Sequence, residues 1–164
     1  ANDISNYQAL CWLCNTTKGN RSKTDFRGLE KYYEERKIGC LFCDELPNQE
    51  RSRIVAENAL AYVAEDKFPI TKFHRLVIPK RHTMDFFELE QAELNAITAL
   101  LHSQKAEIEK ADPSVRGFNI GMNCGEVAGQ SVWHCHVHLV PRRVGDVEKP
   151  RGGVRNIIPG KGDY

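Results

Sequence analysis

Three of the six histidines in the chain alternate with apolar residues in one short segment, His134-Cys135-His136-Val137-His138. Successive side chains of a β-strand point to opposite faces, so a strand here places three imidazole rings on one face and Cys135 and Val137 on the other. A neutral imidazole is a good nucleophile toward phosphorus and a common metal ligand. The alternative, a half-exposed strand whose polar face carries histidine by chance, fits one histidine better than three.

The six cysteines include two Cys-x-x-Cys pairs, Cys11–Cys14 and Cys40–Cys43. A disulfide framework would suit a small secreted domain, but the neighbouring histidines and the lack of a recognisable signal sequence favour thiolates that hold a metal. We therefore expect a reducing, cytoplasmic compartment. On spacing alone two arrangements stay open: one Cys₄ site made by both pairs, or a site in which Cys40 and Cys43 take two ligands from elsewhere in space.

The bulk composition is that of an ordinary globular protein of 164 residues, with 41% hydrophobic and 27% charged residues. The formal net charge of +1 gives no general attraction to nucleic acid or to an anionic membrane. No apolar run approaches the roughly 18 residues that a membrane-spanning helix needs. We therefore expect no membrane partner.

The elements that would position these side chains alternate between strand and helix patterns. Residues 15–37 are polar and predict a linker, with a short helix at Leu29–Arg36. A long helix is predicted within residues 88–112, where Leu94, Ile97, Leu101 and Ile108 recur at helical spacing. The order of elements indicates an α+β fold with an antiparallel sheet. Strands are predicted within residues 53–66 (two strands broken at Glu57 and Asn58), 72–80 (ended by Pro79), 117–125 and 131–142.

The alternating run also resembles the His-φ-His-φ-His-φ-φ signature of the histidine triad (HIT) superfamily of nucleotide hydrolases and transferases. "NCGEVAGQSVWHCHVHLVPR" resembles the glycine loop and final strand of that family, "KFHRLVIPKRH" its central strand, and "CLFC" the opening of its zinc-containing branch. The resemblance spans residues 38–143. It implies a zinc-stabilised HIT-like fold with a five-stranded antiparallel sheet, one long helix and a short one. Residues 38–164 would form the HIT domain with a basic tail, after a finger-like remnant and linker at 1–37.

The resemblance implies a role for each polar residue. His136 would be the nucleophile, and His138 would contact the phosphate and assist the leaving group. Asp66 would bind the ribose, although it could instead be a turn residue before Pro69. The nucleotide and phosphate contacts would come from Asp66, His74, Asn123, Gln130, Ser131 and His138, and a structural Zn²⁺ would be held by Cys40, Cys43, His82 and His134.

These assignments predict a hydrolase that acts at an α-phosphate through a nucleotidyl-histidine and releases a nucleoside monophosphate. A dinucleoside polyphosphate such as diadenosine tetraphosphate is the preferred substrate class. The alternatives are a nucleoside phosphoramidase, a nucleotidyltransferase or phosphorylase, and a non-catalytic zinc module that binds nucleotide or associates with DNA. The resemblance also implies a homodimer, paired through the sheet and the helix at Leu94–Ile108.

The two ends of the chain carry weaker signals. "SNYQALCWLCNTTKGN" resembles the second half of an HNH-type zinc finger, but the first Cys pair and the catalytic Asp-His of such a finger do not precede Ala1. The segment is therefore the remnant of a fused module or the start of a downstream fragment, and nucleic acid is expected only through it. In the tail Arg151–Tyr164, basic side chains could select the substrate or could simply pack.

Overall fold

The computed structural model describes residues 36–162 of the chain. The helix predicted at Leu29–Arg36 lies outside this range apart from its last residue, and so do Cys11 and Cys14. Among residues 36–162, none of the helices has both the length and the apolar character that crossing a bilayer requires.

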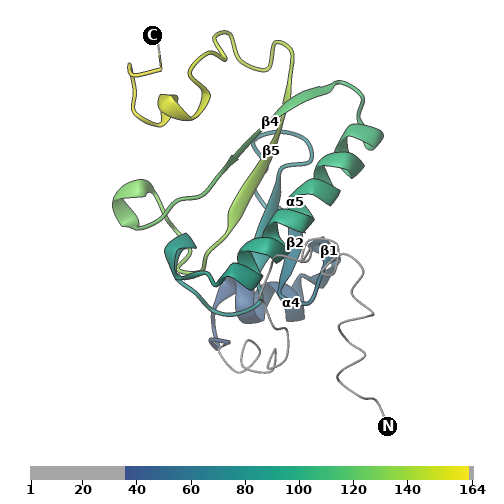
Figure 1. Cartoon of the computed structure of the whole chain (residues 1–164), viewed down its shortest axis with the longest axis vertical. Helices are drawn as coiled ribbons and strands as arrows, with labels where there is room; N and C mark the ends of the chain where they lie inside the picture. The colour runs from purple at the N-terminus through teal and green to yellow at the C-terminus, as the bar shows by residue number, and fades with distance from the viewer. Residues whose placement is uncertain (1–35, 163–164) are drawn as a thin grey trace.

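The described chain folds into an antiparallel five-stranded sheet with one long helix across it (Figure 1). The strand order is β1-β2-β3-β5-β4, so β5 lies between β3 and β4. The helix α5, Gln91–Ala111, connects β3 to β4. The predicted α+β fold with a five-stranded antiparallel sheet is confirmed. The strands are β1 (Ile54–Glu57), β2 (Ala61–Glu65), β3 (Arg75–Pro79), β4 (Val115–Gly121) and β5 (Val137–Arg143).

The hairpin between β1 and β2 is closed by the side chain of Asn58. Its Oδ1 accepts hydrogen bonds from the amides of Leu60 at 3.1 Å and Ala61 at 2.9 Å. Its Nδ2 donates to the carbonyl of Ala96 in α5 at 2.8 Å, which fastens the turn to the helix. The predicted break between two strands is present at Asn58, but Glu57 belongs to β1 and pairs with Tyr62. The physical reason is the tendency of asparagine to satisfy nearby backbone amides.

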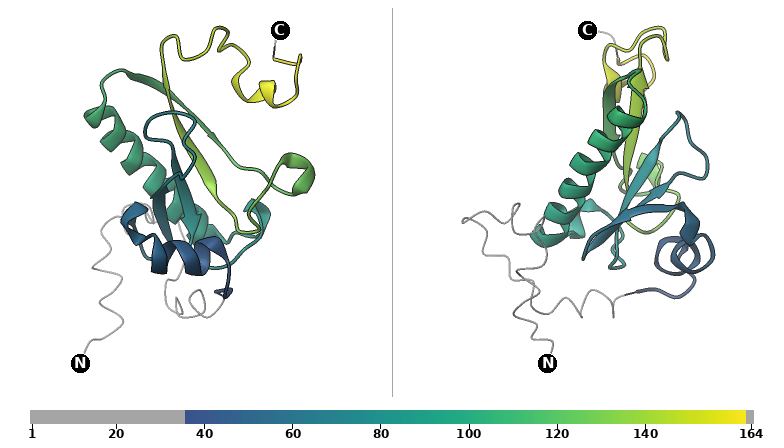
Figure 2. Two further views of the ribbon diagram at one scale, coloured as in Figure 1. Left: turned by 180° about the vertical axis from the view of Figure 1, so that it is seen from behind. Right: turned by 90° about the vertical axis from the view of Figure 1, so that its right-hand side faces the viewer.

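The two faces of the sheet carry different clusters of side chains. On one face Val77 and Val137 pack against apolar residues of α5. On the other face Tyr62 and Leu76 pack against the segment Cys40–Leu46. Figure 2 shows this segment on the opposite side of the sheet from α5. Because strand side chains alternate, the neighbours of Val137 along the chain point to the second face, where the candidate site lies.

A short helical segment begins this second layer. The π-helix η3, Leu41–Glu45, continues directly into the α-helix α4, Leu46–Gln49. The amide of Glu45 donates to the carbonyl of Cys40 at 3.4 Å, the five-residue spacing of a π-turn. The short helix that the resemblance implies is therefore present, whereas the helix predicted at Leu29–Arg36 lies outside the described residues apart from its last residue. One turn of α-helix with a proline near its start is too short to produce a periodic signal.

Strand β5 begins later than predicted, at Val137, so His134 and His136 precede the strand instead of lying in it. The cause is a competing backbone contact, because the amide of Cys135 donates to the carbonyl of Thr83 at 2.7 Å. Pairing with β3 starts only at Val137. The histidine rings nevertheless stay on one side, as their mutual contacts show below.

Helix α5 buries two polar side chains that the apolar pattern did not indicate, Glu93 and Gln104, each 0% exposed. Leu94 and Leu101, which the spacing placed on the buried face, are only half-buried. The helix begins with a capping box in which the side chains of Glu90 and Glu93 satisfy each other's backbone amides. Burial along this helix therefore follows its tertiary partners as well as its periodicity.

The described part of the carboxy-terminal tail, up to residue 162, contains the 3₁₀-helix η7, Gly153–Ile157, which packs against β4. Arg155 Nε donates to the carbonyl of Lys161 at 3.1 Å and folds the tail onto itself. Figure 1 shows the tail beyond the far end of β5 from the alternating histidines. Selection of substrate by this tail stays a prediction.

Candidate functional site

Four predicted metal ligands meet beside the second face of the sheet. Cys40 and Cys43 come from the start of η3, His82 follows β3, and His134 precedes β5. Their donor atoms all lie within 4.8 Å of one another. The Sγ atoms of Cys40 and Cys43 each lie 3.4 Å from His134 Nδ1, and Cys43 Sγ lies 3.4 Å from His82 Nδ1.

These separations fit a tetrahedral zinc site. Zinc lies about 2.3 Å from sulfur and about 2.0–2.1 Å from imidazole nitrogen, so two ligands of a tetrahedron are about 3.6 Å apart. His134 Nε2 donates to the carbonyl of Pro79 at 2.9 Å, which leaves the lone pair on Nδ1, facing the sulfurs. The rival Cys₄ arrangement needs Cys11 and Cys14, which lie outside the described residues.

The two thiols of the cluster influence each other's ionisation. The hydrogen bond from Cys43 lowers the pKa of Cys40, although burial opposes this shift. The same bond raises the pKa of Cys43, because its proton is shared with the neighbouring sulfur, and burial adds to the effect. Because thiolates are the form that binds a metal, a divalent cation bound here would favour deprotonation of both sulfurs.

His136 is held in one orientation by three neighbours. Its Nδ1 donates to the carbonyl of His134 at 2.8 Å, so Nε2 carries the lone pair. Its ring lies edge to face with Phe42 at 5.2 Å between centroids, and 5.1 Å from the ring of His138. Burial lowers the pKa of His136 because the imidazolium loses its hydration. A neutral ring with a fixed lone pair can attack phosphorus.

His138 is hydrogen-bonded to His74, and the contacts of His74 determine which nitrogen of each ring carries the hydrogen. The amide of Ile70 donates to His74 Nδ1 at 3.4 Å, which leaves the hydrogen of a neutral His74 on Nε2. That nitrogen lies 3.0 Å from His138 Nδ1 and donates to it, so His138 carries its own hydrogen on Nε2. Asp66 Oδ2 lies 3.4 Å from His74 Nδ1, where it would pair with a protonated ring.

The imidazole rings of His74 and His138 are both neutral at neutral pH. Burial lowers the pKa of His138 to about 4, and the nearby His136 and His74 act in the same direction. Burial also lowers the pKa of His74, against the opposing charge of Asp66. Asp66, His74 and His138 are close enough to share a metal ion, but His74 presents its two nitrogens to different partners, so hydrogen bonding accounts for the trio.

The loop before the histidines is closed by Gln130. Its Oε1 accepts from the amide of Gly125 at 2.7 Å, and its Nε2 donates to the carbonyls of Met84 at 2.6 Å and Val132 at 3.1 Å. Gly125 has φ +87°, a conformation that favours glycine. To contact a phosphate, the side-chain amide of Gln130 would have to exchange one of these hydrogen-bond partners for a phosphate oxygen. The phosphate contact therefore stays a prediction.

Three other predicted nucleotide contacts lie around this loop and the β2–β3 turn. Asp66 Oδ1 accepts from the amide of Phe68 at 2.8 Å, the contact expected of a turn residue, while Oδ2 faces His74. Asn123 Nδ2 lies 3.4 Å from the carbonyl of Gly129, and Ser131 is exposed at the end of the loop. Their roles toward a nucleotide stay predictions.

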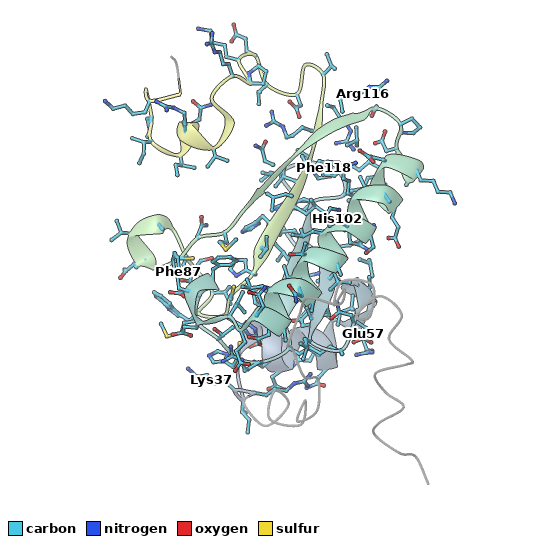
Figure 3. The ribbon with its side chains drawn as sticks, in the orientation of Figure 1. Lys37, Glu57, Phe87, His102, Arg116 and Phe118 are labelled. Carbon is cyan, nitrogen blue, oxygen red and sulfur yellow. The ribbon has the colours of Figure 1, made fainter. Side chains whose placement is uncertain are left out.

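Residue-by-residue reasoning missed two residues that organise the site, one through its side chain and one through its backbone carbonyl. Phe42 is the buried aromatic residue of "CLFC", and Pro79 supplies the carbonyl that orients His134. Their positions inside recognised motifs were the available signal. The sixth histidine, His102, lies exposed on α5 and takes no part (Figure 3).

Comparison with known proteins identifies the class of this fold and site. The HIT domain model matches residues 48–145. An uncharacterized HIT-like protein of Mycoplasma genitalium is 41% identical over 103 residues, which cover 63% of this chain and 72% of that protein. The chain therefore belongs to the HIT family, and its resemblance to that family is confirmed.

Two solved structures and one named enzyme are also similar. A HIT family protein from Bacillus anthracis superposes with a TM-score of 0.61 at 35% identity, over 66% of this chain and 77% of that one. A zinc-bound histidine triad protein from Mycobacterium smegmatis superposes with a TM-score of 0.61 at 31% identity, over 66% and 78%. An AP-4-A phosphorylase of Mycobacterium tuberculosis is 38% identical over 104 residues, which span 60% of this chain and 51% of that enzyme.

Proposed function

We propose that the chain is a nucleotide hydrolase that attacks an α-phosphate with His136 and releases a nucleoside monophosphate. The observation that carries this proposal is the fixed tautomer of His136, whose Nδ1 is committed to a backbone carbonyl so that Nε2 keeps its lone pair. A dinucleoside polyphosphate is the preferred substrate class, and the AP-4-A phosphorylase among the relatives supports that choice.

In the first step the lone pair of His136 Nε2 forms a bond to the α-phosphorus, and the bond from phosphorus to the leaving phosphate oxygen breaks. The leaving group departs as an anion and needs no proton. His138 donates a hydrogen bond from its Nε2–H to this oxygen, a tautomer consistent with the contacts of His74. A fixed donor at the position where charge develops stabilises the transition state.

In the second step a water oxygen attacks the same phosphorus, and the pair of electrons in the N–P bond returns to His136. The hydroxyl stays on the nucleoside monophosphate, and the second proton of the water passes to solvent. Inorganic phosphate could replace water in this step and would yield a nucleoside diphosphate. The named phosphorylase among the relatives makes this the second candidate activity.

The residues around the pocket would bind the rest of the nucleotide. Asp66 is assigned to the ribose hydroxyls, with Ser131 and Asn123 at the phosphates. Ser131 is exposed beside the loop that Gln130 closes, which suits a donor to a phosphate oxygen. His74 would act through His138 by holding its tautomer.

We propose zinc for the cluster of Cys40, Cys43, His82 and His134. Zinc would supply structural cross-linking there, because four protein ligands leave no open position for substrate. The described cysteines are free thiols, which supports a reducing, cytoplasmic location. A homodimer is also proposed, because β4 ends the sheet without a neighbour on its outer side within the described chain.

A substrate panel tests the activity. Wild-type protein incubated with diadenosine tetraphosphate and with a nucleoside phosphoramidate, with and without inorganic phosphate, is followed by product mass analysis. His136→Gly should abolish product formation and keep nucleotide binding, whereas the exposed-helix control His102→Ala should behave as wild type. Release of no mononucleotide from any substrate by the wild type would favour the non-catalytic zinc module instead.

A further inference from the structure

The metal cluster and the candidate nucleophile share one aromatic side chain. Phe42 stands between Cys40 and Cys43 in the chain, and its side chain is buried. Its ring lies edge to face with two histidines, 5.8 Å from His134 and 5.2 Å from His136 between centroids. One ring therefore touches both a candidate metal ligand and the candidate nucleophile.

The backbone around Phe42 is held at several points. The Oη of Tyr62 donates to the carbonyl of Phe42 at 2.6 Å in a buried position. On either side, Cys40 and Cys43 direct their sulfurs to His134 Nδ1 at 3.4 Å. The π-turn of η3 brings the two sulfurs to the same side. A metal bound by both sulfurs would fix the residue that lies between them.

The orientation of the His136 ring depends on such packing. Its Nδ1 hydrogen bond to His134 fixes one edge, and His138 packs on one side at 5.1 Å. Phe42 packs at 5.2 Å with an interplanar angle of 64°. Rotation of the imidazole about its Cβ–Cγ bond would break the bond at Nδ1 and turn Nε2 away, and these two rings oppose that rotation.

We infer that Phe42 is a positioning residue through which the bound metal orients the nucleophile His136. The inference rests on the proposed function for its kinetic consequence, but the coupling between metal site and ring is a separate physical property. The metal thereby acts on the reaction without touching the substrate. A purely structural metal would stabilise the fold and leave the mobility of His136 unchanged.

The kinetic arm uses Phe42→Leu with Leu46→Val as its control. Leu46 is fully buried in the same cluster, and no ring contact joins it to a histidine. With zinc loaded in both variants, Phe42→Leu should lower kcat by about tenfold to a hundredfold, the cost of a misplaced reacting group, with KM changed less than about twofold. Leu46→Val should keep the wild-type kcat. Equal kcat values for the two variants would overturn the inference.

The spectroscopic arm needs no activity, so it separates failure of the inference from failure of the proposed function. Ring resonances of His136 are recorded by NMR in zinc-loaded and zinc-depleted protein. In the wild type, depletion should broaden the His136 signals and mix its tautomers. In Phe42→Leu the signals should already be broad with zinc bound, and depletion should add little. An equal response of both proteins to depletion, or sharp wild-type signals without zinc, would refute the coupling. If depletion unfolds the protein, the same comparison is made between zinc-loaded and cadmium-loaded forms.

Discussion

Replacing Glu93 with glutamine should destabilise the fold by about 3–5 kcal/mol, the usual result of breaking a buried ion pair. The side chain of Glu93 is 0% exposed and that of Arg81 only 14% exposed. Arg81 donates to Glu93 through Nε at 2.9 Å and through Nη2 at 2.7 Å, and the amide of Glu90 donates at 2.9 Å. This arrangement joins the start of α5 to the segment that carries His82.

The magnitude follows from what glutamine can offer these partners. All three groups that face the carboxylate are donors, so an amide NH₂ placed there must face at least one other donor. The substitution therefore loses one charge-assisted hydrogen bond, which contributes about 1.5–3 kcal/mol, and removes the fully buried negative charge that faces the guanidinium of Arg81.

A matched control lies on the same helix. Lys105 Nζ pairs with Glu109 Oε2 at 2.8 Å, but these side chains are 52% and 43% exposed. Glu109→Gln should cost only about 0.3–0.5 kcal/mol, as exposed pairs at this spacing do. Both variants are measured by urea unfolding of zinc-loaded protein, with the m-value checked for constancy. A difference between the two variants below about 1 kcal/mol would refute the assignment of Arg81–Glu93 as a buried pair.

Two further predictions concern the metal and the pH dependence. His82→Ala should reduce zinc from one ion per chain to a substoichiometric amount and lower Tm, measured by metal analysis and calorimetry; retention of a full zinc would show that His82 is not a ligand. The pKa of His138 is about 4 in the folded protein, below its unfolded value of about 6.5. The unfolded state therefore binds more protons between these values, so stability should fall as pH drops from about 6.5 to 4. His138→Asn should flatten this slope in urea titrations at several pH values, and parallel slopes would contradict the burial argument.

Local chemistry made much of the site predictable. Two cysteines separated by two residues can reach one metal ion, and histidines at period two share one face of an extended segment. Spacing alone left the other two ligands open, and the family resemblance implied His82 and His134; the donor atoms of these two and of Cys40 and Cys43 lie within 4.8 Å of one another. The turn at Asn58 was predictable for the same reason, because its side chain satisfies amides two and three residues ahead.

The features that escaped prediction depend on contacts between distant segments. The amide of Cys135 bonds to Thr83, so β5 starts at Val137 and not at the beginning of its apolar-alternating run. Glu93 is buried with Arg81 as its partner, and Arg81 lies before α5, outside the periodic pattern of that helix. The contact between Phe42 and the alternating histidines likewise joins segments about ninety residues apart, as the contact between Cys40 and His134 does. A periodic pattern contains no information about such partners.

The register of β5 connects these observations. Val137 pairs with Val77 and faces α5, while the next residue, His138, pairs with Leu76 and faces the site. A slip of one residue would send every side chain to the opposite face, burying imidazoles against α5 and presenting Val137 to the substrate. The apolar contact with α5 and the metal ligation proposed for His134 would specify the same register from the two faces. Loss of the metal should therefore weaken the site before it weakens the sheet, since the packing against α5 would still hold the strand in place.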